Sequence, residues 1–421
     1  MNPRHVLNFS RLFTSIHHHG MKKTSWLFLF IAFSFFAQSQ SYQKIHDNAV
    51  VVDSHNDFFS KSVEKGFAFD QDLKGKTHSD LQRMKQGGID IQVFSIWCDG
   101  TLGKGKDGAL ANREIDSVYT VVQRNPATMQ LIFTPQDAKK VIKNKKFGVM
   151  MGMEGGHMIE DDLTNLTRFY ERGVRYMTLT WNNSTSWATS AMFETAVKDS
   201  LARIPGYKAS RQLGLTDFGE SVVKRMNELG MLVDLSHVGE QTFWDAIQTT
   251  TKPVLVSHSC AYTLCPVFRN LKDDQIRAVG ENGGVIQVNF FAGFVDSNFK
   301  KRNEDFLLRH KAEKDSLKAI NPVEFFADDY LFEKYADEVK GLRPPLSMLL
   351  DHIDYIVKLI GVDHVGLGSD FDGINSAPQE LDDVTNMPLI TRELLKRGYS
   401  KSDIKKILGG NFLRVFKDNS R

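Results

Sequence analysis

Cysteine is scarce in this sequence. Only three cysteines, Cys98, Cys260 and Cys265, occur in 421 residues, and no two of them form a Cys-x-x-Cys pair. An odd number leaves at least one thiol unpaired within the chain, so a disulfide framework is not expected. A cysteine-based zinc site is not expected either, because such sites use closely spaced cysteine pairs.

The chain also lacks a strong net charge. Its 53 basic and 51 acidic residues leave a formal net charge of +2. This balance gives no electrostatic reason to expect nucleic acid or an anionic membrane as a partner. With 41% hydrophobic and 25% charged residues the composition is that of a globular protein, and the length suits one large α/β barrel.

The most apolar segment lies near the N-terminus. Met21 is followed by two lysines, by the run WLFLFIAFSFFA and by small residues near Ala37 and Ser39, which is typical of a secretory signal peptide. The apolar core is about a dozen residues long, below the roughly 20 of a membrane helix, although an uncleaved anchor is the alternative. We therefore expect residues 1–39 to be a signal region, with translation starting at Met21. Residues 40–421 should form one secreted or periplasmic domain without a stable membrane anchor.

Short apolar runs recur through the rest of the chain and alternate with amphipathic stretches. Their period and composition predict eight strands separated by helices. Eight is the number of strands in a closed (β/α)8 barrel of the TIM type, which is the predicted fold. The expected strands are Ala49–Asp53, Ile89–Ile96, Phe147–Glu154, Val174–Thr180, Met231–Ser236, Val254–His258, Val285–Phe290 and His364–Ser369.

Two helices are predicted together with their ends. Thr216–Leu229 carries apolar residues on one face, and Gly230 suits the end of such a helix. Leu346–Ile360 follows two prolines, which are favoured at helix starts. Residues 296–343, rich in Lys, Glu, Asp and Phe, predict a mostly helical insertion between the seventh and eighth strands. Two roles stay open for it, a solvated helical flank and a lid over the barrel mouth.

Side chains that can bind metal follow four of the predicted strands. His55 and Asp57 form a His-x-Asp motif, and a strand period of two places them on one face. Glu154 ends the run FGVMMGME, His237 ends MLVDLSH and His258 ends PVLVSH. In a (β/α)8 barrel the C-terminal ends of all strands meet at one rim, so these residues can converge.

Each of these residues alone has a structural interpretation. A buried histidine can be a hydrogen-bonded core residue, an aspartate can cap a turn, and a buried glutamate can form a salt bridge. Together they are the nitrogen and oxygen ligands of a zinc-type site, and a glutamate can bridge two cations through its two oxygens. A metal-dependent hydrolase is therefore the leading interpretation.

Two further residues are candidates for the chemistry. Asp370 ends the last strand in HVGLGSD, where a carboxylate can take a proton from an activated water and pass it to a leaving amine. Asp372, two residues on, is expected to shape the loop. Arg269 lies eleven residues after His258 and suits bidentate binding of a substrate carboxylate, with a surface arginine as the alternative.

Taken together, these motifs resemble the membrane (renal-type) dipeptidase family, zinc peptidases of family M19 in the amidohydrolase superfamily. The resemblance runs from about Ala49 to Val415 and rests on DSHND, MGMEGGH, GVRYMTLT, GLTDFGESVV, VDLSHV, SHSCAY, FRNLKDDQI, GLGSDFDG and GGNFLRVF. It implies a dinuclear zinc dipeptidase that hydrolyses L,L- and L,D-dipeptides with a free C-terminal carboxylate. The expected partner is a small dipeptide, and homodimer formation stays open.

The resemblance also implies a ligand set with two zinc ions per chain. The ions would share Glu154 and a bridging hydroxide that attacks the peptide carbonyl. One ion would also bind His55 and Asp57, and the other His237 and His258.

Three residues would act on the substrate if the resemblance holds. Asp370 would accept the proton of the hydroxide and deliver it to the departing amine, and Arg269 would hold the C-terminal carboxylate. Trp181 follows GVRYMTLT, where the best-known animal members have a substrate-contacting histidine and bacterial-type relatives have Trp-Asn. The indole N–H can donate a hydrogen bond, so we expect Trp181 to contact the substrate and to alter preference.

Two alternatives stay open. The first keeps the barrel and the metals but changes the bond, as in a lactonase, lactam hydrolase, deaminase or phosphotriesterase-like enzyme. Phosphotriesterase-type sites use a bridging modified lysine on the fourth strand, and VRYMTLT contains none. The second is a non-catalytic metal- or peptide-binding barrel, since a fold alone does not establish activity. It predicts a gap in the ligand set, and the sequence shows none.

Overall fold

The structure, a computed structural model, describes residues 42–203, 213–321 and 326–421. In these residues a parallel sheet closes on itself, because β1 (Val52–Asp53) pairs with both β2 (Ile91–Trp97) and β9 (Val365–Leu367), and β2 pairs with β4. The remaining barrel strands are β4 (Phe147–Glu154), β5 (Val174–Thr178), β6 (Leu232–Asp234), β7 (Leu255–Val256) and β8 (Val285–Val288). The eight predicted strands all form, and the predicted (β/α)8 barrel is confirmed.

A ninth strand, β3 (Met129–Leu131), was not predicted. It pairs with Phe147–Val149 at the start of β4, whereas β5 pairs with Met151–Glu154 further along the same strand. The two strands therefore share one edge of β4, and β3 is an addition to the barrel. Its three residues are too few to show a period in the sequence.

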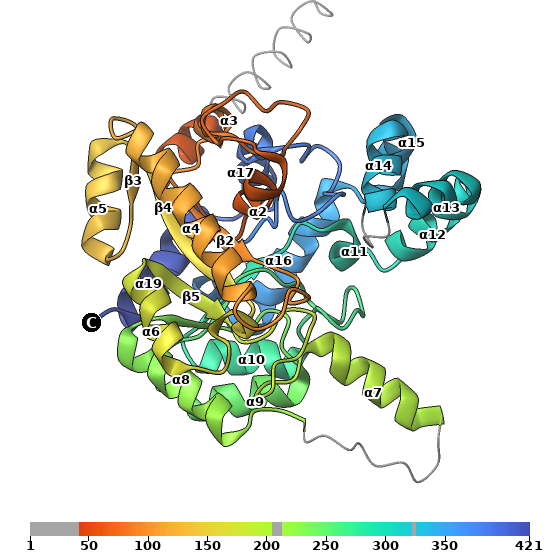
Figure 1. The fold of residues 1–421 in the computed structure, drawn as a ribbon. Helices are drawn as coiled ribbons and strands as arrows, with labels where there is room; N and C mark the ends of the chain where they lie inside the picture. The colour runs from red at the N-terminus through yellow and green to blue at the C-terminus, as the bar shows by residue number, and fades with distance from the viewer. Residues whose placement is uncertain (1–41, 204–212, 322–325) are drawn as a thin grey trace, which may run out of the picture.

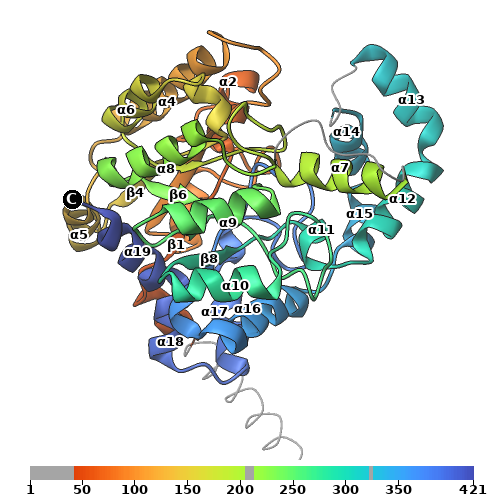
Figure 2. The same ribbon diagram turned by 90° about the horizontal axis from the view of Figure 1, so that it is seen from below.

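Helices cover the outside of the barrel (Figures 1 and 2). The helix α8 (Asp217–Leu229) has the predicted ends: Thr216 caps its first turn, and Gly230 follows with φ 80°. The helix α16 (Leu346–Ile360) begins after Pro345, as predicted. The other α-helices outside the insertion are α2 (Phe58–Lys65), α3 (Leu81–Gln86), α4 (Asp107–Arg124), α5 (Pro135–Asn144), α6 (Leu163–Glu171), α7 (Ala191–Arg203), α9 (Glu240–Thr249), α10 (Asp273–Glu281), α11 (Ala292–Val295), α17 (Pro388–Lys396), α18 (Lys401–Lys405) and α19 (Asn411–Asn419). Short 3-10 or π turns are η1 (Gly156–Ile159), η2 (Val362–His364), η3 (Val384–Asn386) and η4 (Lys406–Gly410).

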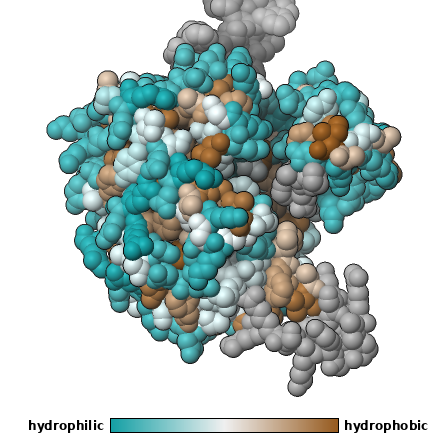
Figure 3. Space-filling model, in the orientation of Figure 1, coloured by the Kyte–Doolittle hydropathy of each residue, from teal (hydrophilic) through white to brown (hydrophobic). Residues whose placement is uncertain are grey.

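The predicted insertion between β8 and β9 is helical. It contains α12 (Phe299–Arg309), α13 (Lys311–Ile320), α14 (Phe326–Lys334) and α15 (Ala336–Leu342), which stand to one side of the barrel (Figure 1). The insertion has a small hydrophobic cluster of its own, which includes Phe299, Phe306, Leu331 and Phe332. Figure 3 shows it as a separate lobe with a mostly hydrophilic surface.

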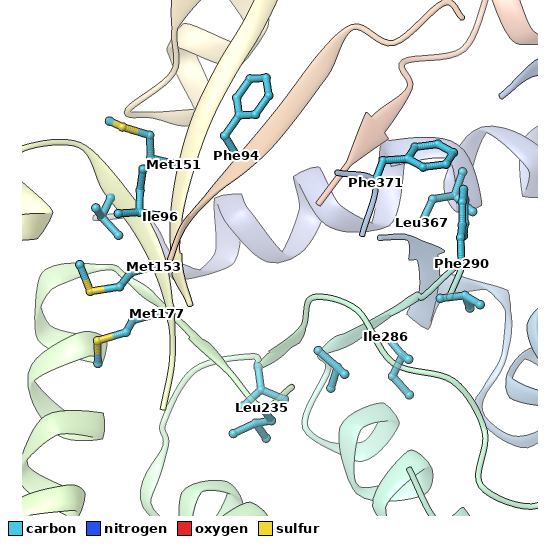
Figure 4. Packing of buried hydrophobic residues seen from close by; sticks show 14 of the residues in the cluster. Phe94, Ile96, Met151, Met153, Met177, Leu235, Ile286, Phe290, Leu367 and Phe371 are labelled. Carbon is cyan, nitrogen blue, oxygen red and sulfur yellow. The ribbon is translucent and has the colours of Figure 1, made fainter. Parts of the chain in front are cut away.

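The alternation of side chains along the strands decides what faces the barrel interior. Phe94 and Ile96 on β2, and Met151 and Met153 on β4, belong to the large hydrophobic cluster of the fold (Figure 4). These four side chains point out of the barrel. Because successive side chains of a strand point to opposite faces, the residues that alternate with them face the barrel interior. Glu154 is thereby directed into the barrel.

Three expectations concern the rest of the chain. Cys98, Cys260 and Cys265 are free and buried. Among the described residues, no helix is both long and apolar enough to cross a membrane. The predicted signal region, residues 1–39, lies outside the described residues and stays a prediction.

Candidate metal centre

The polar residues predicted at the strand ends meet at one rim of the barrel. His55 follows β1, Glu154 ends β4, His237 follows β6 and His258 follows β7. All four are buried, with at most 7% of each residue exposed. The closed sheet brings them together although they are far apart in the sequence.

Glu154 lies at the centre of this group. Its Oε1 is 2.9 Å from His237 Nε2 and 3.3 Å from His258 Nε2. Its Oε2 is 3.4 Å from His55 Nε2 and accepts a hydrogen bond from Ser95 Oγ at 3.2 Å. The two oxygens thus face different histidines, as a carboxylate shared by two cations would.

The His55 imidazole is oriented from behind by Tyr176. The Tyr176 hydroxyl lies 2.7 Å from His55 Nδ1 and donates its own proton to the Ser54 carbonyl at 3.3 Å. Burial would lower the pKa of His55, but Tyr176 and the carboxylates of Asp57 and Glu154 outweigh it and hold that pKa well above its usual range. A metal ion would therefore have to displace a proton from Nε2. The ring of Tyr176 packs where Gly152 lacks a side chain, since a Cβ there would lie 2.0 Å from the ring.

The other two imidazoles are also oriented by polar neighbours. His237 Nδ1 lies 3.0 Å from Asn182 Oδ1, which can only accept, so the proton is on Nδ1. His258 Nδ1 lies 2.8 Å from Ser257 Oγ, whose proton goes to Asp234 Oδ2 at 2.6 Å. His237 and His258 therefore present an Nε2 lone pair to the centre, which is the form that binds a metal.

This arrangement fits a cation. His237 Nε2 and His258 Nε2 are 3.0 Å apart although both carry lone pairs, and His55 Nε2 is buried without a hydrogen-bond partner. Ligand atoms bound to one zinc ion at about 2.1 Å are roughly 3.4 Å apart in tetrahedral geometry. The distances around Glu154, 2.9 to 3.4 Å, are of that size. The donor set of imidazoles and carboxylates also suits manganese and cobalt.

Asp57 and Asp370 extend the cluster beyond His55. Asp57 Oδ2 is 3.4 Å from His55 Nε2, and ligand atoms of His55, Asp57 and Asp370 all lie within 4.8 Å of one another. Asp370 Oδ2 accepts from Asn289 Nδ2 at 2.8 Å. His237 and Asp370 have φ values of 64° and 60°, and such backbone strain in non-glycine residues is concentrated at functional sites.

The charges of the cluster act on one another. Burial would raise the pKa of Glu154, but His55 and the other imidazoles outweigh it and hold that pKa well below its usual range. Burial, and next the Asp57 carboxylate, raise the pKa of Asp370 well above its usual range. Burial, assisted by Arg269, lowers the pKa of His237 to about 4, so this imidazole is neutral at physiological pH and able to bind a metal.

Arg269 contacts the strand end that carries His258 and is 5% exposed. It donates from Nη1 to Ser259 Oγ and from Nη2 to the His258 carbonyl, each at 3.2 Å, and it lies over the Phe294 ring. Its Nε is buried without a partner. Burial lowers its pKa to about 10, so it stays charged at neutral pH. A charged guanidinium with a free donor beside the metal cluster suits an anionic ligand.

Trp181 lies beside His237, with the ring centroids 6.3 Å apart. It forms an edge-to-face pair with Trp97, at 5.1 Å between centroids. Trp97 is the register partner of Glu154 on the neighbouring strand, so it faces the same side of the sheet. The two indoles line one side of the centre, and the sequence alone did not indicate Trp97.

Several supporting residues were missed in the sequence. Tyr176, Asn182 and Ser257 orient the three imidazoles, and Asn289 holds Asp370. Asn289 had a signal, because it follows the apolar run VIQV just as the metal-type residues follow theirs. Asp372 accepts from the backbone N–H of His78 at 2.7 Å, which joins the loop after β9 to residues near His78.

Comparison with known proteins gives a family. The model of the membrane dipeptidase family, peptidase family M19, matches residues 39–421. An uncharacterized dipeptidase of Schizosaccharomyces pombe is 32% identical over 402 residues, which cover 90% of this chain and 82% of that protein.

Solved structures share the fold. The probable dipeptidase PvdM of Pseudomonas aeruginosa has a TM-score of 0.73 at 24% identity, over 91% of this chain and 98% of that chain. A metallopeptidase of Rhodobacter sphaeroides, solved with a phosphinate mimic of the dipeptide L-Ala-D-Ala, has a TM-score of 0.68 at 21% identity, over 88% of this chain and 100% of that chain.

The closed parallel barrel and the cluster of imidazoles and carboxylates at its rim define a metal-dependent hydrolase with an amidohydrolase-like fold. Within that class, the chain belongs to the membrane dipeptidase family, peptidase family M19. It is a dipeptidase with a metallopeptidase fold, and its family implies a metal cofactor.

Proposed function

We propose that this protein is a dinuclear zinc dipeptidase that hydrolyses dipeptides with a free C-terminal carboxylate. The observation that carries the proposal is the position of Glu154, whose Oε1 faces His237 and His258 while its Oε2 faces His55. One ion would be held by His55, Asp57 and Glu154, and the other by Glu154, His237 and His258. When bound, the ions would supply the Lewis acidity that activates water and polarises the peptide carbonyl.

The remaining residues would bind the substrate and move the proton. Asp370 would take the proton of the attacking water and give it to the departing amine. The hydrogen bond from Asn289 Nδ2 at 2.8 Å, which holds the Asp370 carboxylate, supports this role. Arg269 would bind the C-terminal carboxylate through its free Nε. A carboxylate fixed at Arg269, with the scissile bond at the metal centre, would favour dipeptides over longer peptides.

Trp181 and Trp97 would contact the N-terminal side of the substrate. Their edge-to-face pair offers an apolar surface next to His237, and the indole N–H groups are donors for a substrate carbonyl. The phosphinate ligand of the Rhodobacter sphaeroides structure mimics a dipeptide with a D-residue at its second position. It supports the inclusion of L,D-dipeptides among the substrates proposed here.

The test is hydrolysis of a panel of L,L- and L,D-dipeptides by the mature protein, before and after chelation and after zinc is restored. We expect turnover that chelation abolishes and zinc restores, with two zinc ions bound per chain. C-terminally amidated dipeptides should be poor substrates. A protein that binds zinc fully and cleaves none of the dipeptides would contradict the proposal and direct attention to another bond, such as a lactam or lactone.

We also propose that residues 1–39 direct export, because their composition is that of a signal peptide. Expression of the full chain should give a mature protein outside the cytoplasm whose N-terminus lies near residue 40. Recovery of the uncleaved chain in the membrane fraction would contradict this.

A further inference from the structure

Asp234 accepts four hydrogen bonds beneath the metal centre. Its Oδ1 accepts from the backbone N–H groups of Ser236, at 3.2 Å, and Ser257, at 2.8 Å. Its Oδ2 accepts from the hydroxyls of Thr178, at 2.5 Å, and Ser257, at 2.6 Å. The residue is completely buried. The carboxylate thus joins β5, β6 and the residue that precedes His258.

Ser257 links this carboxylate to a candidate metal ligand. Its Oγ lies 2.6 Å from Asp234 Oδ2, 3.2 Å from Ser236 Oγ and 2.8 Å from His258 Nδ1. A hydroxyl has one proton, and the carboxylate is both the nearest and the strongest acceptor. Ser257 Oγ therefore donates to Asp234 and accepts from His258, so the lone pair of His258 is on Nε2.

We propose that Asp234 is a positioning residue that fixes the metal-binding tautomer of His258 through Ser257. The proposal rests on the proposed function, because it takes His258 to be a metal ligand. Outer hydrogen-bond partners of metal-binding histidines typically change metal affinity by about 10- to 100-fold when they are removed.

The two hydrogen bonds that run from His258 Nδ1 to Ser257 Oγ and from Ser257 Oγ to Asp234 form a relay. Asparagine at position 234 would reverse the direction of both hydrogen bonds. Its amide oxygen would face the two backbone N–H groups, which cannot turn away, and its NH2 group would face the two hydroxyls, which can rotate. The NH2 group would then donate to Ser257 Oγ, and Ser257 would donate to His258 Nδ1. The imidazole proton would move to Nε2, where it excludes a metal ion. Removal of the Ser257 hydroxyl as well would break the relay and free His258 to bind.

The opposite side of the barrel has a matched arrangement without an imidazole. Asp53 is equally buried and accepts from the backbone N–H and the hydroxyl of Ser369, at 2.8 and 2.6 Å. The other partners of Ser369 Oγ are backbone groups, the His55 carbonyl at 3.3 Å and the Phe371 N–H at 3.1 Å. Asp53→Asn therefore removes a comparable carboxylate without reversing a histidine tautomer.

The experiment measures zinc affinity by competition with a chromophoric chelator, without any substrate. The proteins are the wild type, Asp234→Asn, Ser257→Ala and the double variant, and cobalt(II) absorption reports the ligand field of each. We expect Ser257→Ala to bind about 10- to 100-fold more weakly than the wild type and Asp234→Asn more weakly still. The double variant should recover to the affinity of Ser257→Ala. Asp53→Asn should show no such recovery when Ser369→Ala is added.

A double variant that binds zinc as weakly as Asp234→Asn, or more weakly, would overturn the proposal. Two independent structural defects would each weaken zinc binding further, whereas removal of the Ser257 hydroxyl should restore affinity if Asp234→Asn acts by reversing the hydrogen bonds to His258. If Asp234→Asn does not fold, Ser257→Ala is compared with Ser54→Ala. Ser54 precedes His55, is equally buried, and its hydroxyl donates to the backbone carbonyls of Ser257, at 2.7 Å, and Leu367, at 3.2 Å. We expect at least a tenfold gap in zinc affinity between these variants, and equal affinities would overturn the proposal.

Zinc affinity is measured without substrate, so the role of Asp234 and the proposed dipeptidase activity can fail independently. A wild type that binds zinc and cleaves no dipeptide would contradict the dipeptidase and leave the relay standing. A zinc-dependent dipeptidase whose zinc affinity is insensitive to Ser257→Ala would contradict the relay alone.

Discussion

The rim of the barrel and the helical insertion are built in opposite ways. At the rim, polar side chains are buried and each is oriented by another polar group, as His55 is by Tyr176 and His237 by Asn182. The insertion has a small apolar cluster and a surface of exposed ion pairs, and α13 buries none of its side chains. Buried polar networks fix geometry, whereas exposed pairs contribute little to stability.

This difference predicts that the two regions can be damaged separately. Changes at the rim should remove metal binding or turnover while the fold remains. Changes in the insertion should loosen its own helices and leave the metal centre intact.

Glu154→Gln should have the largest effect. The substitution removes the negative charge that faces three imidazoles, so we expect loss of bound metal and a fall in kcat/KM of at least about 1,000-fold, roughly 4 kcal/mol. Metal analysis and dipeptide hydrolysis measure the two quantities. Glu194→Gln is the matched control, since Glu194 is also buried but pairs with Lys198 on α7. Unchanged turnover in Glu154→Gln would remove Glu154 from the site.

Arg269→Met should weaken substrate binding and keep the metal. Removal of a charged, buried donor group should raise KM for dipeptides about 100-fold, because a charge-assisted pair with the substrate carboxylate contributes a few kcal/mol. C-terminally amidated dipeptides have no such carboxylate, so their KM should change little. Arg302→Met, which removes a guanidinium that is paired with Asp296 and lies on α12 of the insertion, is the control. Equal effects on both substrate types would contradict the carboxylate clamp.

Phe306→Ala should separate the two regions most clearly. Phe306 is completely buried in the cluster of the insertion and packs edge-to-face on Phe332. Truncation of a buried phenylalanine costs about 3–5 kcal/mol, and we expect faster hydrogen exchange in α12, α14 and α15. Zinc affinity and kcat/KM should stay within about threefold of the wild type, as for a solvated flank. A large fall in kcat/KM with unchanged zinc affinity would establish the insertion as a lid.

The fold was predictable because buried parallel strands have a strong signal. Runs such as FGVMMGME and PVLVSH are apolar on both faces, so all eight barrel strands and the residues that end them could be found. The strand Met129–Leu131 could not, since three residues show no period. The helix that ends at Gly230 was predictable because glycine adopts the left-handed conformation required there.

The orientation of the metal-type side chains was beyond the sequence. Tyr176 reaches His55 only because Gly152 on the neighbouring strand has no side chain. Ser257 acts on His258 only through Asp234 on β6. These are cross-strand relations that depend on register, and a register shift by one residue would turn each side chain to the other face. Sequence patterns therefore predicted which residues come together at the rim, but not which ring nitrogen of each histidine carries the proton.

Lys301→Ala should have the smallest effect and sets the scale for the others. Lys301 is paired with Asp305 one turn on along α12, at 3.0 Å, and both side chains are mostly exposed, at 78% and 52%. Exposed pairs at this spacing contribute about 0.3–0.5 kcal/mol and are screened by salt. Thermal unfolding at low and high salt should show a difference that vanishes at high salt, with turnover unchanged. A larger loss, or any loss of zinc affinity, would mean that the surface of the insertion is coupled to the rim, and the contrast between the two regions would fail.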